Sequence, residues 1–309
     1  MSTWRWTSPF AGLPDGLCRR LAASALHRSD AWGVAMISCG IALWLHGNAS
    51  LDGLILVTTI GIAYWFGYAV NDYFDAPDDA LDERDGHRNP FVGPPIPAHI
   101  VRVCAILIVA LICAGFARFG AAGLAAFSLA LLVVFAYSAP PARLKHRPGW
   151  DVATHALFVQ TYPFALGVVL MDASWQFADT YIAGTCLLAS MSGQVAQQIR
   201  DIEVDARTGS TFVTALGERR GKQTLVAITV LLGVVVVLGL VVGVIPRVLA
   251  PLAVAFLPAF VARVRGVGAR SQHLQAACSA FALLYAIYLL LRVSAPLSAP
   301  VATAIGGIS

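Results

Sequence analysis

The chain has 309 residues, of which 58% are hydrophobic and only 12% are charged, and its mean hydropathy is +0.73. Soluble domains carry roughly 25% charged residues, so this composition excludes an ordinary soluble enzyme. The net charge of +4 is read as a result of membrane topology, and no nucleic-acid partner is expected. We predict an all-α polytopic bundle of about nine transmembrane helices around a central cavity, because long apolar runs in lipid form helices.

Residues 1–30 are predicted to be an N-terminal interfacial segment. They lack the order of charge, apolar core and small-residue cleavage site that marks a signal peptide. Leu17 to Arg28 (LCRRLAASALHR) is typical of an amphipathic helix lying on the membrane surface. An ordinary helical lead-in to the first span is the alternative interpretation.

Apolar runs long enough to span a bilayer, about 20 residues each, fill the predicted membrane domain, 31–295, and leave a tail, 296–309. The runs lie near 31–48, 51–70, 99–117, 120–137, 152–171, 179–198, 224–245, 247–262 and 274–293. The eighth run is short and contains Pro251 and Pro258, so eight spans are the alternative.

The polar connections of a nine-span chain all fall on one side of the membrane. They are 71–98, 138–151, 199–223 and 263–273. Of the 21 Lys and Arg residues, only Arg118, Arg247 and Arg292 fall on the other side. Because Lys and Arg accumulate in cytoplasmic loops, we predict an integral protein of a bacterial cytoplasmic membrane, with its active site facing the cytoplasm.

The first polar connection opens with the densest acidic stretch, NDYFDAPDDALDERD, directly after an apolar run. If the helix continues past Val70, Asn71, Asp75 and Asp79 recur every four residues and share one face with Asp72. Pro77 removes a backbone donor and disfavours helix at the residue before it. The helix could therefore end or kink there, and Asp78 could take the place of Asp79.

A second acidic pair, Asp201 and Asp205 in RDIEVD, lies four residues apart on the helix that leaves the sixth run. Two acidic clusters on one side of a bundle repel each other strongly unless a cation lies between them. Mg²⁺ is typically held by one or two carboxylates together with substrate phosphates. Mg²⁺ is therefore the predicted cofactor.

Basic side chains accompany the acids, as expected of a site that binds a phosphate ester. RDGHRNP supplies Arg84, His87 and Arg88, YSAPPARLKHRPGWD supplies Tyr137, Arg143, Lys145 and Arg147, and Arg200 precedes the second acidic pair. The chain therefore has acidic residues that can hold a metal ion, basic residues that can hold phosphate, and an apolar bundle that can hold a lipid tail. Together these features favour an enzyme acting on a lipid phosphate.

These motifs resemble the UbiA superfamily of intramembrane prenyltransferases over about residues 30–290. NDYFDAPDD matches the NDxxDxxxD motif, RDIEVD matches the second motif, and YSAPPARLK before GW is similar to chlorophyll-synthase-like and carotenoid-elongase-like branches. RDGHRNPFVG stands where the 4-hydroxybenzoate branch has an RTxxRP-like tract, which disfavours ubiquinone biosynthesis.

The resemblance implies a nine-helix bundle around a central cavity capped by the cytoplasmic loops. It also implies Mg²⁺-dependent ionisation of a prenyl diphosphate and attack by a lipophilic acceptor on the allylic cation. The implied Mg²⁺ ligands are Asn71, Asp72, Asp75, Asp79, Asp201 and Asp205. The implied diphosphate contacts are Arg88, Tyr137, Lys145 and Arg200. The predicted catalytic residues among them are Asp72, Asp75, Asp201, Lys145 and Tyr137.

The leading hypothesis is prenyl transfer to an aromatic, carotenoid or other isoprenoid acceptor. A terpene cyclase of the same superfamily is the alternative, since aromatic faces stabilise cations. Its candidate residues are Tyr64, Trp65, Phe66, Tyr68, Phe158, Tyr162 and Phe164, which core packing explains equally well. Transfer of another group from a diphosphate donor is a variant. A cation transporter is disfavoured because the acids gather at one face, whereas transporters bind ions near the midplane.

Overall fold

The computed structural model describes residues 17–80, 89–93, 96–265 and 273–294, and this part of the chain is helical without any β-strand. In chain order its elements are α1 (Leu17–His27), α2 (Ser29–Leu45), α3 (Leu51–Asp79), α4 (Ala98–Ala117), α5 (Gly120–Ser138), η1 (Leu144–His146), α6 (Trp150–Ala156), η2 (Leu157–Thr161), α7 (Tyr162–Val169), α8 (Phe177–Arg200), α9 (Ile202–Thr208), α10 (Phe212–Leu216), α11 (Glu218–Val242), η3 (Arg247–Leu249), α12 (Ala250–Ala255), α13 (Leu257–Val264) and α14 (His273–Ser294). The predicted all-α class is confirmed.

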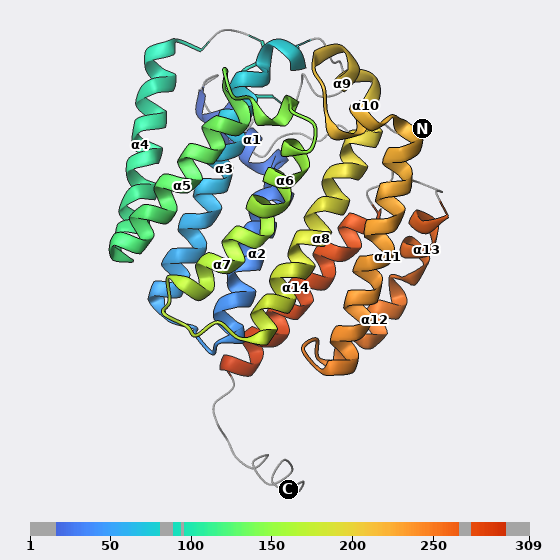
Figure 1. Cartoon of the computed structure of the whole chain (residues 1–309). Helices are drawn as coiled ribbons and strands as arrows, with labels where there is room; N and C mark the ends of the chain where they lie inside the picture. Colours follow the sequence, from blue (N-terminus) through green and yellow to red (C-terminus); the bar gives the residue numbers. More distant parts are fainter. Residues whose placement is uncertain (1–16, 81–88, 94–95, 266–272, 295–309) are drawn as a thin grey trace, which may run out of the picture.

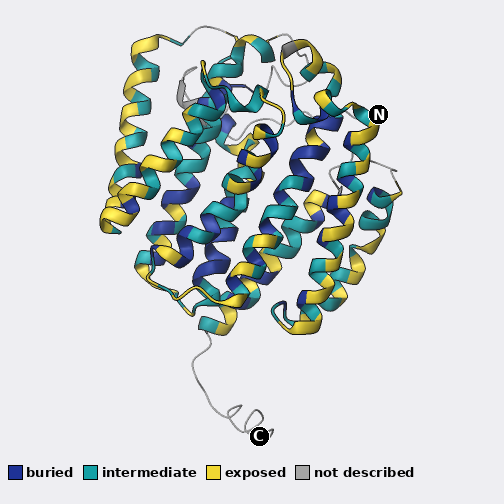
Figure 2. Cartoon of the chain, viewed as in Figure 1, coloured by how far each residue is buried: buried dark blue, intermediate teal, exposed yellow. Residues whose placement is uncertain are grey.

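The long helices lie side by side as one bundle, with the short α9 and α10 at its upper end (Figure 1). Buried residues line the inside of the bundle and exposed ones lie on the outer helix faces (Figure 2). Those outer faces carry large apolar side chains such as Leu107, Leu132 and Val241. An apolar exterior of this kind suits lipid, because hydrocarbon offers no hydrogen bonds to polar side chains.

Six helical segments of the described ranges are long and apolar enough to cross a membrane, and a seventh is reached if the bent pair α12 and α13 is one span. α2 is apolar but has 17 residues. The predicted eighth run is bent by 53° between α12 and α13. Pro258 lies in the first turn of α13 and lacks the N–H that a continuous helix needs. The integral membrane character is confirmed, whereas the count of nine spans stays a prediction.

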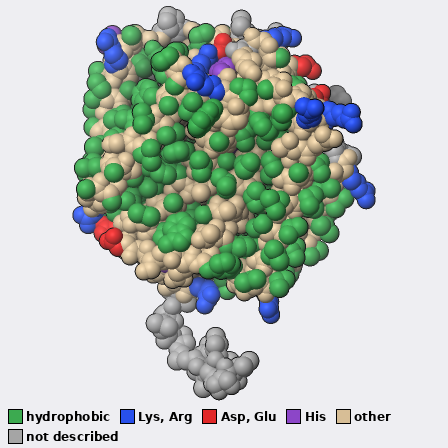
Figure 3. Space-filling model, in the orientation of Figure 1, with side chains coloured by type: hydrophobic (Ala, Val, Ile, Leu, Met, Phe, Trp, Pro, Cys, Tyr) green, Lys and Arg blue, Asp and Glu red, His purple; other side chains and the backbone are tan. Residues whose placement is uncertain are grey.

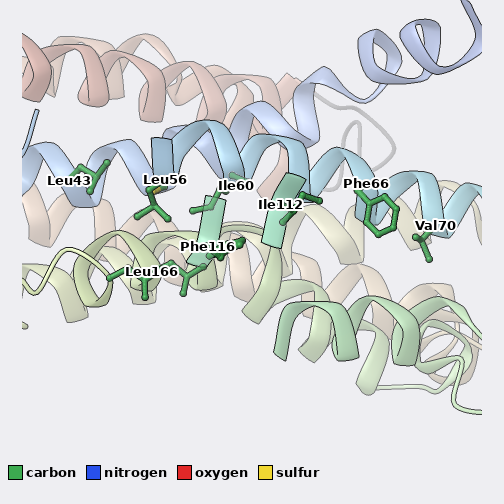
Figure 4. Close-up of a cluster of buried hydrophobic side chains, with 11 residues drawn as sticks. Leu43, Leu56, Ile60, Phe66, Val70, Ile112, Phe116 and Leu166 are labelled. Atoms are coloured by element: carbon green, nitrogen blue, oxygen red, sulfur yellow. The ribbon is translucent and has the colours of Figure 1, made fainter. Parts of the chain in front are cut away.

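A buried apolar cluster fixes α3 against its neighbours (Figure 4). Its labelled members come from α2, α3, α4 and α7 and are Leu43, Leu56, Ile60, Phe66, Val70, Ile112, Phe116 and Leu166. Val70 directly precedes the first acidic motif, so this packing determines where α3 presents its polar end. Close helix approach supports the cluster: a Cβ at Gly167 of α7 would lie 2.9 Å from the carbonyl oxygen of Cys39 in α2.

Charged side chains gather toward the two ends of the bundle, and apolar side chains cover its middle (Figure 3). The end that carries the last turn of α3 also carries the start of α11 and the short helices α9 and α10 (Figure 1). Both acidic motifs therefore lie at the same end of the bundle, as the sequence predicts.

Candidate functional site

The first acidic motif lies on the last turns of α3, which runs through Pro77 and ends at Asp79. The helical hydrogen bonds resume after the proline, because the Ala80 amide donates to the Ala76 carbonyl at 3.1 Å. The helix does not end before Pro77, and the four-residue spacing of Asn71 and Asp75 places both side chains on one face. The side-chain amide of Asn71 donates to Asp75 Oδ2 at 2.8 Å.

Asp78 and Asp79 take different partners at the end of α3. The Asn89 side chain donates to Asp79 Oδ2 at 2.8 Å and to the main-chain carbonyl of Asp72 at 2.7 Å. Asp78 instead pairs with the Arg143 guanidinium at 2.7 Å. Asn89, which is buried, thus joins Asp79 to Asp72, which favours Asp79 over Asp78 as the third acid of the motif.

Asp75 lies at the centre of a polar cluster contributed by α3, α5 and η1. Lys145 donates to Asp75 Oδ1 and, at 3.3 Å, to Asn71 Oδ1. The Arg143 guanidinium lies 3.4 Å from the same Asp75 oxygen, and the Ser138 hydroxyl donates to Asn71 at 3.2 Å. Burial lowers the pKa of Lys145 to about 8. Lys145 therefore stays cationic at neutral pH and balances the charge of Asp75.

Asp72 is almost fully buried, at 1% exposure, and forms an ion pair with Arg28 at 2.6 Å. Its second oxygen, Oδ2, has no hydrogen-bond partner among the described residues. Arg28 directly follows α1, and Arg20 of α1 donates to the Val92 carbonyl at 2.8 Å. The predicted N-terminal helix is present, and these contacts place it over the first motif; its interfacial position stays a prediction.

The second acidic pair lies where α8 passes into α9. Arg200, the last residue of α8, bonds to both carboxylate oxygens of Asp201 at 3.2 Å. Asp205 lies on α9 and accepts from the Thr211 hydroxyl at 3.4 Å. Burial, with repulsion from Asp201 and Asp151, raises the pKa of Asp205 to about 6. A cation bound between Asp201 and Asp205 would relieve the repulsion between their carboxylates.

Asp151 is a residue of this region that the sequence analysis did not single out. It is fully buried at the start of α6 and accepts hydrogen bonds from the Gln198 side chain at 2.7 Å and the Phe212 amide at 2.6 Å. Gln198 in turn accepts from the Val213 amide at 3.1 Å. Asp151 thereby connects α6, α8 and the start of α10, and holds the second motif in place. Its position directly after GW, at the end of a basic connection, was the available signal.

The segment around η1 contacts both motifs. Lys145 reaches α3, while a Cβ at Gly209, just after α9, would overlap the imidazole of His146. Arg143 precedes η1 with φ +39°, a left-handed conformation that is costly for a non-glycine residue and common at functional sites. Tyr137, at the end of α5, lies beside the side chain of Gln194 in α8. The predicted residues Arg84, His87 and Arg88 lie outside the described residues.

The first-motif acids are paired with basic and amide side chains of the same chain. In the part of the chain that the structure describes, no group of three or more His, Cys, Asp and Glu side chains is placed to hold a metal ion. The first-motif carboxylates instead contact Arg28, Arg143, Lys145 and Asn89. The metal-ligand roles of the acids therefore stay predictions.

Comparison with curated proteins finds relatives that act on a carotenoid. A lycopene elongase/hydratase from Corynebacterium glutamicum is 27% identical over 177 residues. This alignment spans 55% of the chain and 59% of the relative, so the chain matches little more than half of that protein's length. A second lycopene elongase/hydratase of Corynebacterium glutamicum matches equally.

Solved structures share the fold over nearly the whole chain. A UbiA homologue from Archaeoglobus fulgidus bound to DMAPP and Mg²⁺ superposes with a TM-score of 0.69 at 18% identity, covering 89% of this chain and 99% of that chain. The same homologue bound to GPP and Mg²⁺ gives a TM-score of 0.68 at 18% identity, with coverages of 88% and 99%. A digeranylgeranylglyceryl phosphate synthase gives 0.65 at 12% identity, with coverages of 89% and 99%. The model of the UbiA prenyltransferase family matches residues 33–290, and the chain therefore belongs to this family.

Proposed function

We propose that the protein transfers a prenyl group from a prenyl diphosphate to a linear polyene acceptor, such as a carotenoid, and releases pyrophosphate. The observation that carries this proposal is the polar cluster of Asp75, Lys145, Arg143 and Asn71 at one end of an apolar bundle. A diphosphate can bind at this cluster while its hydrocarbon chain lies among apolar helices. Likeness to a homologue bound to DMAPP and Mg²⁺ supports the donor.

Mg²⁺ fits the donor set of the two motifs, since hard cations prefer carboxylate and amide oxygens. The ligands would be Asn71, Asp72, Asp75, Asp79, Asp201 and Asp205. The buried Oδ2 of Asp72, which lacks a hydrogen-bond partner within the described residues, supports this fit, because a buried carboxylate oxygen needs a donor or a cation. When bound, Mg²⁺ would neutralise the charge that develops on the leaving pyrophosphate.

The chain's own cations would act on the same leaving group. Lys145 is 11% exposed and cationic at neutral pH, and Arg143 lies beside it. If their carboxylate partners turn to a metal, both cations can donate to phosphate oxygens, which Arg binds bidentately. Tyr137 and Arg200 flank the site and are proposed as further contacts of the diphosphate, together with Arg88. The apolar walls would exclude water from the allylic cation.

The proposed acceptor follows from the curated relatives, which are lycopene elongase/hydratases. Five of the aromatic residues considered for a cyclase have contacts that bear on this choice. Phe66 and Phe164 belong to buried core clusters. Tyr64 donates to the Phe158 carbonyl, and the Phe158 and Tyr162 rings lie 4.9 Å apart. These two contacts bring three aromatic side chains together inside the bundle, which suits both an allylic cation and a polyene chain.

The test is a product analysis of the purified full chain in detergent with Mg²⁺. Dimethylallyl, geranyl, farnesyl and geranylgeranyl diphosphate are each supplied with and without lycopene, and pyrophosphate and lipid products are measured. We expect Mg²⁺-dependent pyrophosphate release and an elongated polyene. A cyclised hydrocarbon formed without lycopene would instead make the protein a terpene cyclase. Absence of pyrophosphate release from every donor would overturn prenyl transfer altogether.

Mg²⁺ affinity should fall as the pH drops below about 6, the pKa of Asp205. Below that pH the folded, metal-free Asp205 carries a proton that Mg²⁺ must displace, so affinity should fall by roughly fourfold between pH 7.5 and pH 5.5. Titrating Mg²⁺ at pH 7.5 and pH 5.5 by calorimetry measures the effect. Asp205→Asn should bind Mg²⁺ more weakly and with little pH dependence in this window. Equal affinity of the wild type at both pH values would contradict a ligand role for Asp205.

A further inference from the structure

Polar side chains continue from the second motif down into the membrane part of the bundle. On α8, Gln198, Gln194 and Ser190 recur every four residues and are all buried, so they lie along one helix face. Gln198 bonds to Asp151 of α6, and Gln194 lies beside Tyr137 of α5. Buried polar groups at this depth are costly and mark function more often than packing.

His155 lies one turn below Asp151 on α6 and continues this series. The lipid-facing side of α6 is marked by Trp150 and Leu157, which are 63% and 49% exposed. The helical period of 3.6 residues per turn places His155 on the opposite side, toward the interior of the bundle. His155 is therefore an ionisable residue that faces inward within a membrane span.

One ring nitrogen of His155 is buried without a partner. Nδ1 makes no hydrogen bond among the described residues. A neutral imidazole carries one hydrogen, and with that hydrogen on Nε2 the lone pair of Nδ1 is available to accept a proton. Since buried polar atoms are nearly always hydrogen-bonded, a buried nitrogen without a partner points to a functional role.

A π-helical segment, η2, begins two residues after His155. Single π-turns inside α-helices occur frequently at functional sites. Here the turn exposes the Phe158 carbonyl to the Tyr64 hydroxyl of α3, and Phe158 packs against Tyr162. The free Nδ1 of His155 thus lies in the same stretch of α6 and η2 that presents aromatic rings to the interior.

The depth of His155 matches the place where the reaction would occur. Asp151 is close enough to Asp205 to raise its pKa, so Asp151 lies at the level of the second motif. Four helical residues correspond to about 6 Å along the axis. A prenyl diphosphate with its phosphates at the acidic motifs has its allylic carbon below them, which is the level of His155.

We propose that His155 is a catalytic base that removes the proton released when the new carbon–carbon bond forms. This inference rests on the proposed function. The allylic C–O bond breaks, and its electron pair leaves with the diphosphate. A double bond of the polyene supplies the electron pair of the new C–C bond and becomes a tertiary cation. His155 Nδ1 then takes a proton from the adjacent carbon, the C–H electrons form a new double bond, and the proton finally leaves with pyrophosphate.

The test compares His155→Asn and His155→Gln with wild type in the purified full chain, using dimethylallyl diphosphate and lycopene with Mg²⁺. Two quantities are measured: the rate of pyrophosphate release, and the ratio of the elongated polyene formed by proton loss to the elongated tertiary alcohol formed when water captures the same cation. We expect pyrophosphate release to stay within about threefold of wild type. We expect the product ratio to fall by roughly 100-fold, a typical contribution of a general base, as water captures the cation.

His99→Asn is the matched control, because His99 is exposed at the start of α4 and should leave both quantities unchanged. Two substitutions of His155, by Asn and by Gln, are compared so that the test does not depend on one variant folding correctly. Size-exclusion chromatography detects a misfolded variant. An unchanged product ratio, or an equal loss of pyrophosphate release and product, would overturn the role of His155 while leaving prenyl transfer standing. A wild-type chain that releases no pyrophosphate from any donor would overturn both proposals.

Discussion

Replacing Asp75 by alanine should lower Mg²⁺-dependent pyrophosphate release by roughly 10³-fold, comparable to losing a preorganised electrostatic group in other active sites. Asp75 is the acid on which the first-motif contacts converge: Lys145 and Arg143 meet one of its oxygens and Asn71 the other. Its loss removes a predicted metal ligand and leaves Lys145 without its carboxylate partner. Pyrophosphate release by the purified variant measures the effect, and thermal unfolding in detergent checks that the bundle is intact.

Asp78→Ala is the matched control for this prediction. Asp78 lies three residues further along the same helix and forms an ion pair with Arg143 at 2.7 Å. Since an ion pair at 30% and 33% side-chain exposure is worth less than about 1 kcal/mol, turnover should stay within about fivefold of wild type. Wild-type turnover by Asp75→Ala would refute the metal-site assignment. A loss in Asp78→Ala as large as in Asp75→Ala would make Asp78 a member of the motif.

Lys145→Met should have two effects of opposite sign. Turnover should fall by roughly 10²-fold, because the variant loses a cation that would stabilise the leaving pyrophosphate. The affinity for Mg²⁺ alone should rise by roughly tenfold, because Lys145 no longer competes for Asp75, and a close cation changes the energy of a carboxylate by about that factor. Calorimetry without substrate measures the affinity, and pyrophosphate release measures the turnover.

Lys222→Met separates these effects from a general loss of positive charge. Lys222 pairs with Glu218 on the exposed first turns of α11, at 45% side-chain exposure, and its removal should change neither quantity. A Lys145→Met protein with weaker Mg²⁺ binding would show that Lys145 orients Asp75 for the metal and does not compete with it. Unchanged turnover would exclude Lys145 from contact with the diphosphate.

The spacing of the first motif allowed its geometry to be predicted from sequence. Residues four apart on a helix share a face, and Asn71 and Asp75 are indeed hydrogen-bonded. The helix end was not predictable in this way. Pro77 disfavours helix locally, yet α3 continues to Asp79 because Asn89 and Arg143 bind its last acids from other segments. Tertiary contacts of this kind leave no periodic signal in the sequence.

The partners of the buried carboxylates were the part of the site that the sequence did not reveal. Arg28 before an apolar run is typical of a topology signal, but in the fold it pairs with Asp72. Asp151 at the start of a span resembles a boundary charge, but it is fully buried and bonds to Gln198 and the Phe212 amide. Both roles depend on which helices become neighbours, and spacing along one helix carries no information about that.

The polar face of α8 has a consequence for how the chain enters the membrane. α8 packs against α6 and α11. Six helical segments of the described residues are long and apolar enough to cross a membrane, and α8 is not one of them. Its buried side chains Ser190, Gln194 and Gln198 would meet lipid tails if the helix left the translocon alone, where amide groups find no hydrogen-bond partners. If α8 is the sixth span, as the sequence predicts, its insertion requires neighbouring helices that shield this face and is a cooperative step.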